Sequence, residues 1–364
     1  MPAPLVPMSP YLLVPLSPYL LVPLSPYLLV PLSLHLSYSP SLTLTLPPRP
    51  SPRYNPPPMA RRRPLIDWLI YCGIRLVGMA FQMFPINVNL RTARWMGSIW
   101  YRLMRRHRER AFEHLRLAYG NELSQADRER IALASMQQMT MLAVETLFTP
   151  RLINEWTWPR YVRLKNLGPA ADVLLSRRGA ILVTGHYGSW ELLGFTLTAL
   201  GFPTVAVMRP LDNPYLNSYV MDVRARRGLQ LLYKKGAARS AGEILSSGGT
   251  LAFIADQNAG HKGLFVDFFG RKASTYKSIG LLAIEYKVPI VVGYARRVSD
   301  RFEYELGCNR VIHPEEWAGK DDELRWITQE YTRAIEAFIR EAPEQYLWIH
   351  RRWKSRPRDE LAVG

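Results

Sequence analysis

A histidine and a glutamate lie five residues apart, where an apolar run gives way to an apolar-rich helical stretch. His186 comes two residues after the run 180–184, and Glu191 falls near the start of the stretch that follows. A carboxylate at that spacing could reach one imidazole nitrogen, fix the tautomer and leave the other nitrogen free to remove a proton. The pattern indicates a general base, although Glu191 could equally be a negative charge that favours a helix start.

No protein nucleophile accompanies this histidine. The sequence has no Gly-x-Ser-x-Gly elbow, and neither Cys72 nor Cys308 lies near a candidate base along the chain. The nucleophile is therefore expected to be a hydroxyl of the substrate. The absence of Walker A and Gly-x-Gly-x-x-Gly motifs argues against nucleotide chemistry. The other histidines show no metal-ligand spacing, so no metal site is expected.

Five short apolar runs predict the strands that position His186. They cover residues 180–184, 203–207, 229–233, 250–254 and 289–294. Helical stretches separate most of them, and strands that alternate with helices predict an α/β fold with a mostly parallel sheet flanked by helices. Such sheets place chemistry at the carboxyl ends of their strands, where His186 and Asp256 both fall.

Three longer helices are expected outside the strands. Residues 124–148 and 321–341 begin with capping or acidic residues that favour a helix N-terminus. Residues 64–84 form an apolar stretch about as long as a bilayer-spanning helix, interrupted by Asp67 and Arg75. The arginines at 61–63 favour a membrane anchor or an interfacial helix with a cytoplasmic flank, and a buried helix is the alternative. The arginine-rich run 102–110 favours contact with anionic lipid, and a solvated helix face is the alternative.

The first 58 residues differ from the rest of the chain. The octapeptide Ser-Pro-Tyr-Leu-Leu-Val-Pro-Leu occurs three times from residue 9 to residue 32, and a Ser/Pro/Leu tract continues to Pro58. Frequent prolines prevent a continuous helix and remove donors from a strand, so this tract is predicted to be disordered. Met59 precedes a basic cluster and is the hypothetical translation start. The predicted domains are the tract 1–58, an anchor with a basic juxtamembrane segment 59–104, a catalytic domain 105–357 and a tail 358–364.

The composition indicates a folded and strongly basic protein. Of the 364 residues, 48% are hydrophobic and 21% charged, which excludes a wholly disordered chain. The net charge of +17 favours anionic partners such as nucleic acid, acidic proteins or anionic lipid. Two cysteines far apart exclude a disulfide framework and favour a reducing compartment.

Four segments together resemble a known enzyme family. GHYGSWELLG at 185–194 resembles the His-x4-Asp/Glu block of glycerolipid-type acyltransferases, and in particular of the late acyltransferases of lipid A biosynthesis. RPLDNP at 209–214, DQNAG at 256–260 and APEQYLWIHRRWK at 342–354 are similar to further blocks of that family, in the family's order. The resemblance covers roughly residues 64–357 and implies a glycerol-3-phosphate acyltransferase-like fold.

The resemblance implies roles for the residues in these blocks. His186 would deprotonate an acceptor hydroxyl, Glu191 would orient the imidazole, and the hydroxyl would attack an acyl thioester. Arg209 would face the oxyanion or a substrate phosphate, with a structural ion pair to Asp212 as the alternative. Substrate binding is expected from Arg209, Asp212, Asn213, Asp256 and Gln257, and a structural role for Asp256 is equally open. Contact with a carrier protein or a phosphate is expected from His350, Arg351, Arg352 and Lys354, unless these form only a solvated basic tail.

The implied function is that of a membrane-associated O-acyltransferase. It would move a fatty acyl chain from acyl carrier protein, or from coenzyme A, to a hydroxyl of a lipid A precursor at the cytoplasmic face of the inner membrane. No cofactor is expected, because a thioester donor needs none. The expected partners are an acidic acyl carrier protein, a lipid or glycolipid acceptor and the membrane surface, not nucleic acid. The alternatives are the same chemistry on another glycolipid, such as a phosphatidylinositol mannoside, and a nonenzymatic basic membrane-binding protein.

Overall fold

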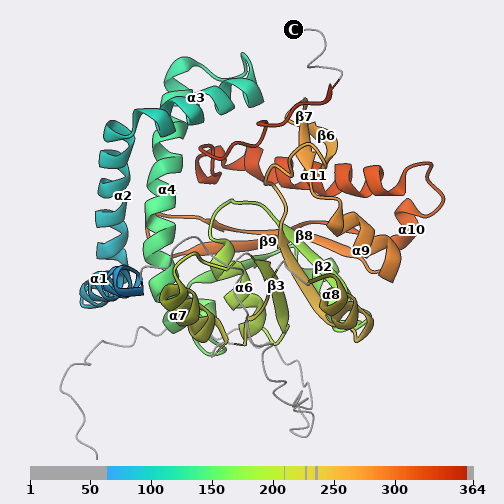
Figure 1. Ribbon diagram of the computed structural model, residues 1–364, viewed down its shortest axis with the longest axis horizontal. Coiled ribbons are helices and arrows are strands. Elements are labelled where there is room, and N and C mark those ends of the chain that lie inside the picture. The colour runs from blue at the N-terminus through green and yellow to red at the C-terminus, as the bar shows by residue number, and fades with distance from the viewer. Residues whose placement is uncertain (1–63, 209, 226–227, 234–236, 359–364) are drawn as a thin grey trace, which may run out of the picture. The chain divides into compact units, whose positions relative to one another are not determined.

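The computed structural model describes residues 64–208, 210–225, 228–233 and 237–358. The predicted repeat tract 1–58, the hypothetical start at Met59 and most of the tail 358–364 lie outside the described residues. A sheet occupies the middle of the described part, with helices on both of its faces and a group of N-terminal helices at one side (Figure 1).

The central sheet has seven strands and is mostly parallel, which confirms the predicted α/β fold. Its strands are β1 (Val162–Lys165), β2 (Ala180–Thr184), β3 (Thr204–Met208), β4 (Gln230–Tyr233), β5 (Thr250–Ile254), β8 (Ile290–Arg297) and β9 (Tyr304–Ile312). They lie in the order β1-β9-β8-β2-β5-β3-β4, and only the pair β8 and β9 is antiparallel. A separate antiparallel hairpin joins β6 (Leu264–Phe268) to β7 (Arg271–Thr275).

Helices cover both faces of the sheet. On one face lie α8 (Ala237–Ser246), α9 (Ser278–Tyr286) and α11 (Glu323–Glu341), which contribute Leu245, Ile279 and Phe338 to the main core. On the other face, α5 (Gly168–Leu175) and α6 (Trp190–Ala199) pack against Leu182 and Val291 of the sheet. Every residue of β2 is therefore buried, which explains why its sequence is an unbroken apolar run up to Thr184. The remaining elements after residue 152 are α7 (Pro214–Ala225), α10 (Pro314–Trp317) and the short 3-10 helices η1 (Trp158–Arg160) and η2 (Pro343–Gln345).

Four helices precede the sheet. They are α1 (Pro64–Gln82), α2 (Ile86–Leu103), α3 (Arg105–Tyr119) and α4 (Gln125–Leu152). α4 begins as predicted, because the Ser124 hydroxyl accepts a hydrogen bond of 3.1 Å from the backbone N–H of Asp127. The predicted helix 64–84 ends slightly earlier, at Gln82, and the chain turns before Pro85. Among the described helices, α1 alone is long and apolar enough to cross a membrane.

The predicted strands match the central part of the sheet. Runs 180–184 and 250–254 coincide with β2 and β5, and the other three runs differ from β3, β4 and β8 only at their ends. Strands β1, β6, β7 and β9 have no predicted counterpart. The chemistry-bearing loops follow β2 and β5, so the elements that position the site are among those the sequence predicts.

Candidate active site

The loop between β2 and α6 carries His186 at the carboxyl end of the sheet. Gly188 in this loop has a φ of +56°, and a Cβ there would lie 2.0 Å from the carbonyl oxygen of Ala295. Only glycine allows this close approach, in which the backbone N–H of Ser189 donates to the same carbonyl at 2.8 Å. The buried Ser189 side chain makes no capping hydrogen bond at the start of α6, so the loop is fixed by its backbone.

Asp256 is the carboxylate that contacts the imidazole. Its Oδ1 lies 2.7 Å from Nδ1 of His186, and its Oδ2 accepts the backbone N–H of His186 at 2.9 Å. The register of the sheet explains this meeting: β2 and β5 are parallel neighbours with Thr184 opposite Ile254, and each side chain stands two residues further on. Asp256 is almost fully buried, so its carboxylate is committed to this contact.

The electrostatics of the pair favour a charged aspartate and a basic imidazole. Burial by itself opposes both charged forms, but attraction to the Asp256 carboxylate outweighs it and raises the pKa of His186 above its usual value. Burial likewise works against the Asp256 anion, yet the His186 ring and backbone N–H lower the pKa of this carboxyl below its usual value. With Nδ1 directed at the carboxylate, Nε2 is the nitrogen available for proton transfer.

Glu191 does not hold the imidazole, which corrects the predicted contact. Its carboxylate forms an ion pair with the guanidinium of Arg224 from α7, in which Nε of Arg224 lies 3.2 Å from Oε2. Glu191 sits in the first turn of α6, and that turn directs the side chain toward α7 instead of toward Nδ1 of His186. Glu191, Arg224 and His186 nevertheless line one cavity, so the ion pair and the imidazole face the same space. Arg224 was not predicted from the sequence, where nothing marks it out.

Gln257 and His350 flank His186 on two sides. The Gln257 amide nitrogen lies 3.3 Å from Nε2 of His186. The ring of His350 is stacked on that of His186, with centroids 5.8 Å apart and planes 12° from parallel. Burial lowers the pKa of His350, so this second imidazole is held in its neutral form and adds no positive charge beside the first. Two of the predicted site residues are therefore brought to His186 from distant parts of the chain.

A cavity of about 520 Å³, lined in part by His186, extends between the sheet and α5 and α6. Its polar lining side chains include Thr184, His186, Glu191, Arg224 and Gln257. The rest of the lining is largely apolar and includes Leu174, Leu182, Leu197, Leu229, Leu231 and Val291. The arrangement is an apolar chamber with a basic nitrogen and an ion pair among its lining groups.

The predicted block 209–214 is placed only in part. Arg209 lies outside the described residues. Asn213 immediately precedes α7, and its Oδ1 accepts the backbone N–H groups of Tyr215 and Leu216 at 3.0 and 3.1 Å. Its Nδ2 donates to the carbonyl of Asp67 in α1 at 2.8 Å. These three bonds make Asn213 a helix cap and a tie to α1, while Asp212 beside it is exposed.

The predicted basic cluster near the C-terminus divides into buried and exposed members. Arg352 is buried, and its guanidinium donates to Thr275 Oγ1 at 2.7 Å and to the Gln257 carbonyl at 3.4 Å. A partner protein cannot reach it, so the predicted carrier contact is wrong for Arg352, which instead supports the loop after β5. Arg351 and Lys354 are exposed and keep the predicted surface position.

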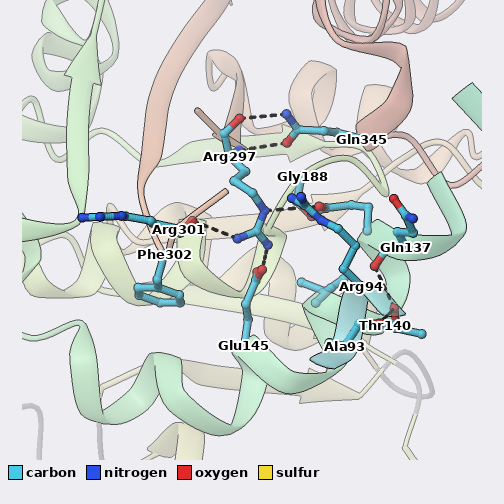
Figure 2. Close-up of polar contacts among 12 residues, drawn as sticks. Ala93, Arg94, Gln137, Thr140, Glu145, Gly188, Arg297, Arg301, Phe302 and Gln345 are labelled. Carbon is cyan, nitrogen blue, oxygen red and sulfur yellow. Dashed lines mark hydrogen bonds and ion pairs between the residues drawn. The ribbon is translucent and has the colours of Figure 1, made fainter. Parts of the chain in front are cut away.

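A buried arginine at the end of β8 ties α4 and η2 to the catalytic loop (Figure 2). The guanidinium of Arg297 pairs with Glu145 of α4, and its backbone N–H and carbonyl bond the side chain of Gln345 at 2.8 and 2.9 Å. The backbone carbonyl of Gln345 accepts the N–H of Gly188 at 3.0 Å. Gln138 of α4 bonds both the Arg297 guanidinium and the Gly188 carbonyl, each at 3.4 Å. Arg297 and Glu145 were not predicted, because burial is their only distinguishing feature.

Comparison with known proteins gives a consistent result. Residues 59–355 match the family of bacterial lipid A biosynthesis acyltransferases. Lipid A biosynthesis lauroyltransferase of Escherichia coli K12 is 27% identical over 297 residues, which cover 80% of this chain and 92% of the relative. Lipid A biosynthesis palmitoleoyltransferase of the same organism is 28% identical over 305 residues (81% and 94%), and its myristoyltransferase is 23% identical over 299 residues (81% and 88%).

Proposed function

This chain belongs to the bacterial lipid A biosynthesis acyltransferases, and from that premise we propose that it moves a fatty acyl chain from acyl carrier protein to a hydroxyl of a lipid A precursor. It is an acyltransferase, as its relatives are named. The proposal rests on one observation above all: Asp256 holds Nδ1 of His186 at 2.7 Å, while the same imidazole lines an apolar cavity.

His186 serves as the general base. Nε2 removes the proton of the acceptor hydroxyl as its oxygen attacks the carbonyl carbon of the thioester, and the Asp256 carboxylate stabilises the imidazolium that forms. The carbon–sulfur bond then breaks, and the imidazolium returns the proton to the departing thiolate. The acceptor gains an ester and the carrier regains its thiol, so the reaction requires no cofactor. The Gln257 side chain must move away from Nε2 so that the acceptor hydroxyl can bind there.

The apolar cavity is the proposed site of the acyl chain. Its leucine-rich lining suits a fatty acyl tail, because apolar surface of both chain and protein leaves water on binding. A tail in this cavity would place its thioester near the polar groups, beside His186. Arg209 keeps its proposed role at the oxyanion or at a phosphate of the acceptor. Glu191 and Arg224 would form the polar rim against which the thioester rests.

The proposed donor is supported by the net charge of the chain, and the proposed location by α1. An acidic acyl carrier protein suits a chain with a net charge of +17, and exposed Arg351 and Lys354 are proposed contacts for it. α1 is proposed to anchor the enzyme at the cytoplasmic face of the inner membrane. The lipid acceptor could then stay in the bilayer while the soluble donor arrives from the cytosol.

Lipid analysis of a strain that lacks this chain tests the proposed acceptor. Mass spectrometry should show lipid A species that have lost one acyl chain. Expression of the wild-type protein should restore fully acylated lipid A. The His186→Ala variant should fail to restore it, while the exposed-histidine control His261→Ala should succeed. Unchanged lipid A together with the loss of an acyl chain from another glycolipid would move the same chemistry to a different acceptor.

A further inference from the structure

Helix α2 presents an apolar face to the outside of the protein. Trp95 is 64% exposed and Leu103 is 72% exposed, and Val88 and Met96 are also exposed large side chains. These positions recur at intervals of seven or eight residues with Met96 beside Trp95, so they fall on one side of the helix. Figure 1 shows α2 on the edge of the described part of the protein, beyond α4 and away from the sheet.

The opposite side of α2 is fixed against α4. Leu90, Ala93 and Gly97 are buried there, and a Cβ at Gly97 would lie 2.5 Å from the Cα of Gln137. Thr140 of α4 donates to the Ala93 carbonyl at 2.7 Å, as Figure 2 shows. Because this close packing sets the rotation of α2, its apolar face cannot turn inward and stays directed away from the core.

The exposed apolar side chains continue into the turn before α2, in a segment whose charged residues are all basic. Met83 and Phe84, in the turn between the two helices, are exposed as well. The sequence holds no acidic residue between Asp67 and Glu109, while Arg91, Arg102, Arg105 and Arg106 are exposed on α2 or directly after it. Along α2 and the start of α3, exposed apolar side chains therefore alternate with exposed arginines: Arg91, Trp95, Met96, Arg102, Leu103, Arg105 and Arg106.

We propose that α2 lies in the interface of an anionic bilayer as a second membrane contact beside α1. Tryptophan with aliphatic side chains and flanking arginines is the composition of helices that rest in the headgroup region, where arginines meet lipid phosphates. A surface for a soluble acidic protein would not require these apolar side chains to remain in water. The inference rests on the membrane location in the proposed function and extends it from an anchor to an orientation.

The second contact has a consequence for the active site. A second helix that lies along the membrane surface beside α1 adds a second point of attachment, and two points fix how the body faces the bilayer. α2 is packed on α4, and α4 bonds the catalytic loop through Gln138 and the C-terminal segment through Ser135, whose hydroxyl donates to the Tyr346 carbonyl. Packing and hydrogen bonds through α2 and α4 therefore connect the proposed membrane contact to the loop that carries His186.

Single fluorescent labels on the full chain test this inference. In a Cys72→Ser, Cys308→Ser background, an environment-sensitive dye is attached to Trp95→Cys or Leu103→Cys on α2, to Leu69→Cys on α1, or to Trp156→Cys as a control. Trp156 is 81% exposed and lies after α4, away from α2 in the sequence. Each protein is mixed with vesicles of phosphatidylethanolamine and phosphatidylglycerol that carry quenchers at a shallow or a deep position.

The labels at 95 and 103 should shift to shorter wavelength and be quenched several-fold more by the shallow quencher than by the deep one. The label at 69 should be quenched by the deep one, and the label at 156 should stay aqueous. Labels at 95 and 103 that stay aqueous while the label at 69 enters the bilayer would overturn the α2 contact and leave the α1 anchor standing. An aqueous label at 69 would overturn the anchor itself. A shift at 95 that needs acyl carrier protein instead of vesicles would make this face a protein-docking site and also overturn the proposal.

Discussion

The Asp256 carboxylate sets how strongly His186 holds a proton. It raises the pKa of the imidazole above its usual value of 6.5 against the opposing effect of burial. Only the neutral imidazole can act as the base, so the rate constant kcat/KM should rise with pH as His186 loses its proton. The midpoint of this rise in kcat/KM should therefore lie at a pH above the usual histidine pKa.

Asp256→Asn is expected to change both the rate and the pH profile. The amide removes the attraction to the imidazolium but leaves the burial, so the pKa of His186 falls and the acidic limb moves to lower pH. The maximal kcat should drop about 10²- to 10⁴-fold, since the imidazolium loses its stabilising charge. Steady-state kinetics across pH check this. A limb that stays in place, or moves to higher pH, would show that Asp256 does not act through His186.

The ion pair of Glu191 and Arg224 should behave as one unit in stability. Both side chains are mostly shielded, at 13% and 15% exposed, so removing either charge leaves the other poorly solvated. Glu191→Gln or Arg224→Gln alone should cost about 3 kcal/mol in the free energy of unfolding, and the double variant should cost less than the sum. Urea unfolding measures all three. The exposed pair Arg105 and Glu109 is the matched control, and its loss should matter little. Additive losses at 191 and 224 would argue against a coupled pair.

His186 could be predicted from the sequence, but its partner could not. Glu191 is close along the chain, and spacing alone favours it over a residue 70 positions away. The true contact depends on which strands become neighbours, and only the order β2-β5 places Thr184 opposite Ile254. One feature of the sequence could have identified Asp256 as the partner: His186 and Asp256 each lie two residues beyond an apolar run.

At the scale of elements, burial on both faces decides what the sequence reveals. β2 and β5 lie inside the sheet, and each shows a continuous apolar run that predicts its bounds. β9 pairs with β8 and β1 but carries Glu305 and Arg310 among its apolar residues, so no run marks it. β1 has a single buried residue, Val162, and lies at the edge of the sheet. Charged residues within a strand, as in β9, or exposure at the edge of the sheet, as in β1, leave the weaker signal.

The loop after β2 should tolerate no side chain at Gly188. Gly188→Ala would place a Cβ 2.0 Å from the Ala295 carbonyl oxygen in addition to the cost of a positive φ. Gly201→Ala is the matched control, because Gly201 has a φ of +88° and a Cβ at that position would meet no other atom within 4 Å. The control should lose about 1 kcal/mol in the free energy of unfolding, and Gly188→Ala clearly more, with a loss of kcat. Equal losses in thermal or urea unfolding would mean that the approach to Ala295 is not needed.

At the scale of the whole molecule, net charge should govern the encounter with the donor. A chain at +17 attracts an acidic carrier protein over a distance that salt shortens, so kcat/KM for the carrier-linked donor should fall several-fold as ionic strength rises. Exposed Arg351 is tested with Arg351→Gln, which should lower kcat/KM for the carrier-linked donor more than for acyl coenzyme A. Initial rates at low donor concentration measure both effects. Equal losses for the two donors would assign Arg351 to the acceptor.

Acyl transfer by the purified full chain in detergent tests the roles of His186 and Asp256 most directly. The reaction contains acyl carrier protein loaded with a fatty acyl chain and a lipid A precursor with a free hydroxyl, and mass spectrometry follows the lipid. The precursor should gain one acyl chain. His186→Ala should reduce the rate by about 10²-fold or more with little change in unfolding temperature, while His261→Ala should keep it. Undiminished transfer by folded His186→Ala, or no transfer by the wild-type chain from any acyl thioester, would contradict a mechanism built on His186 and Asp256.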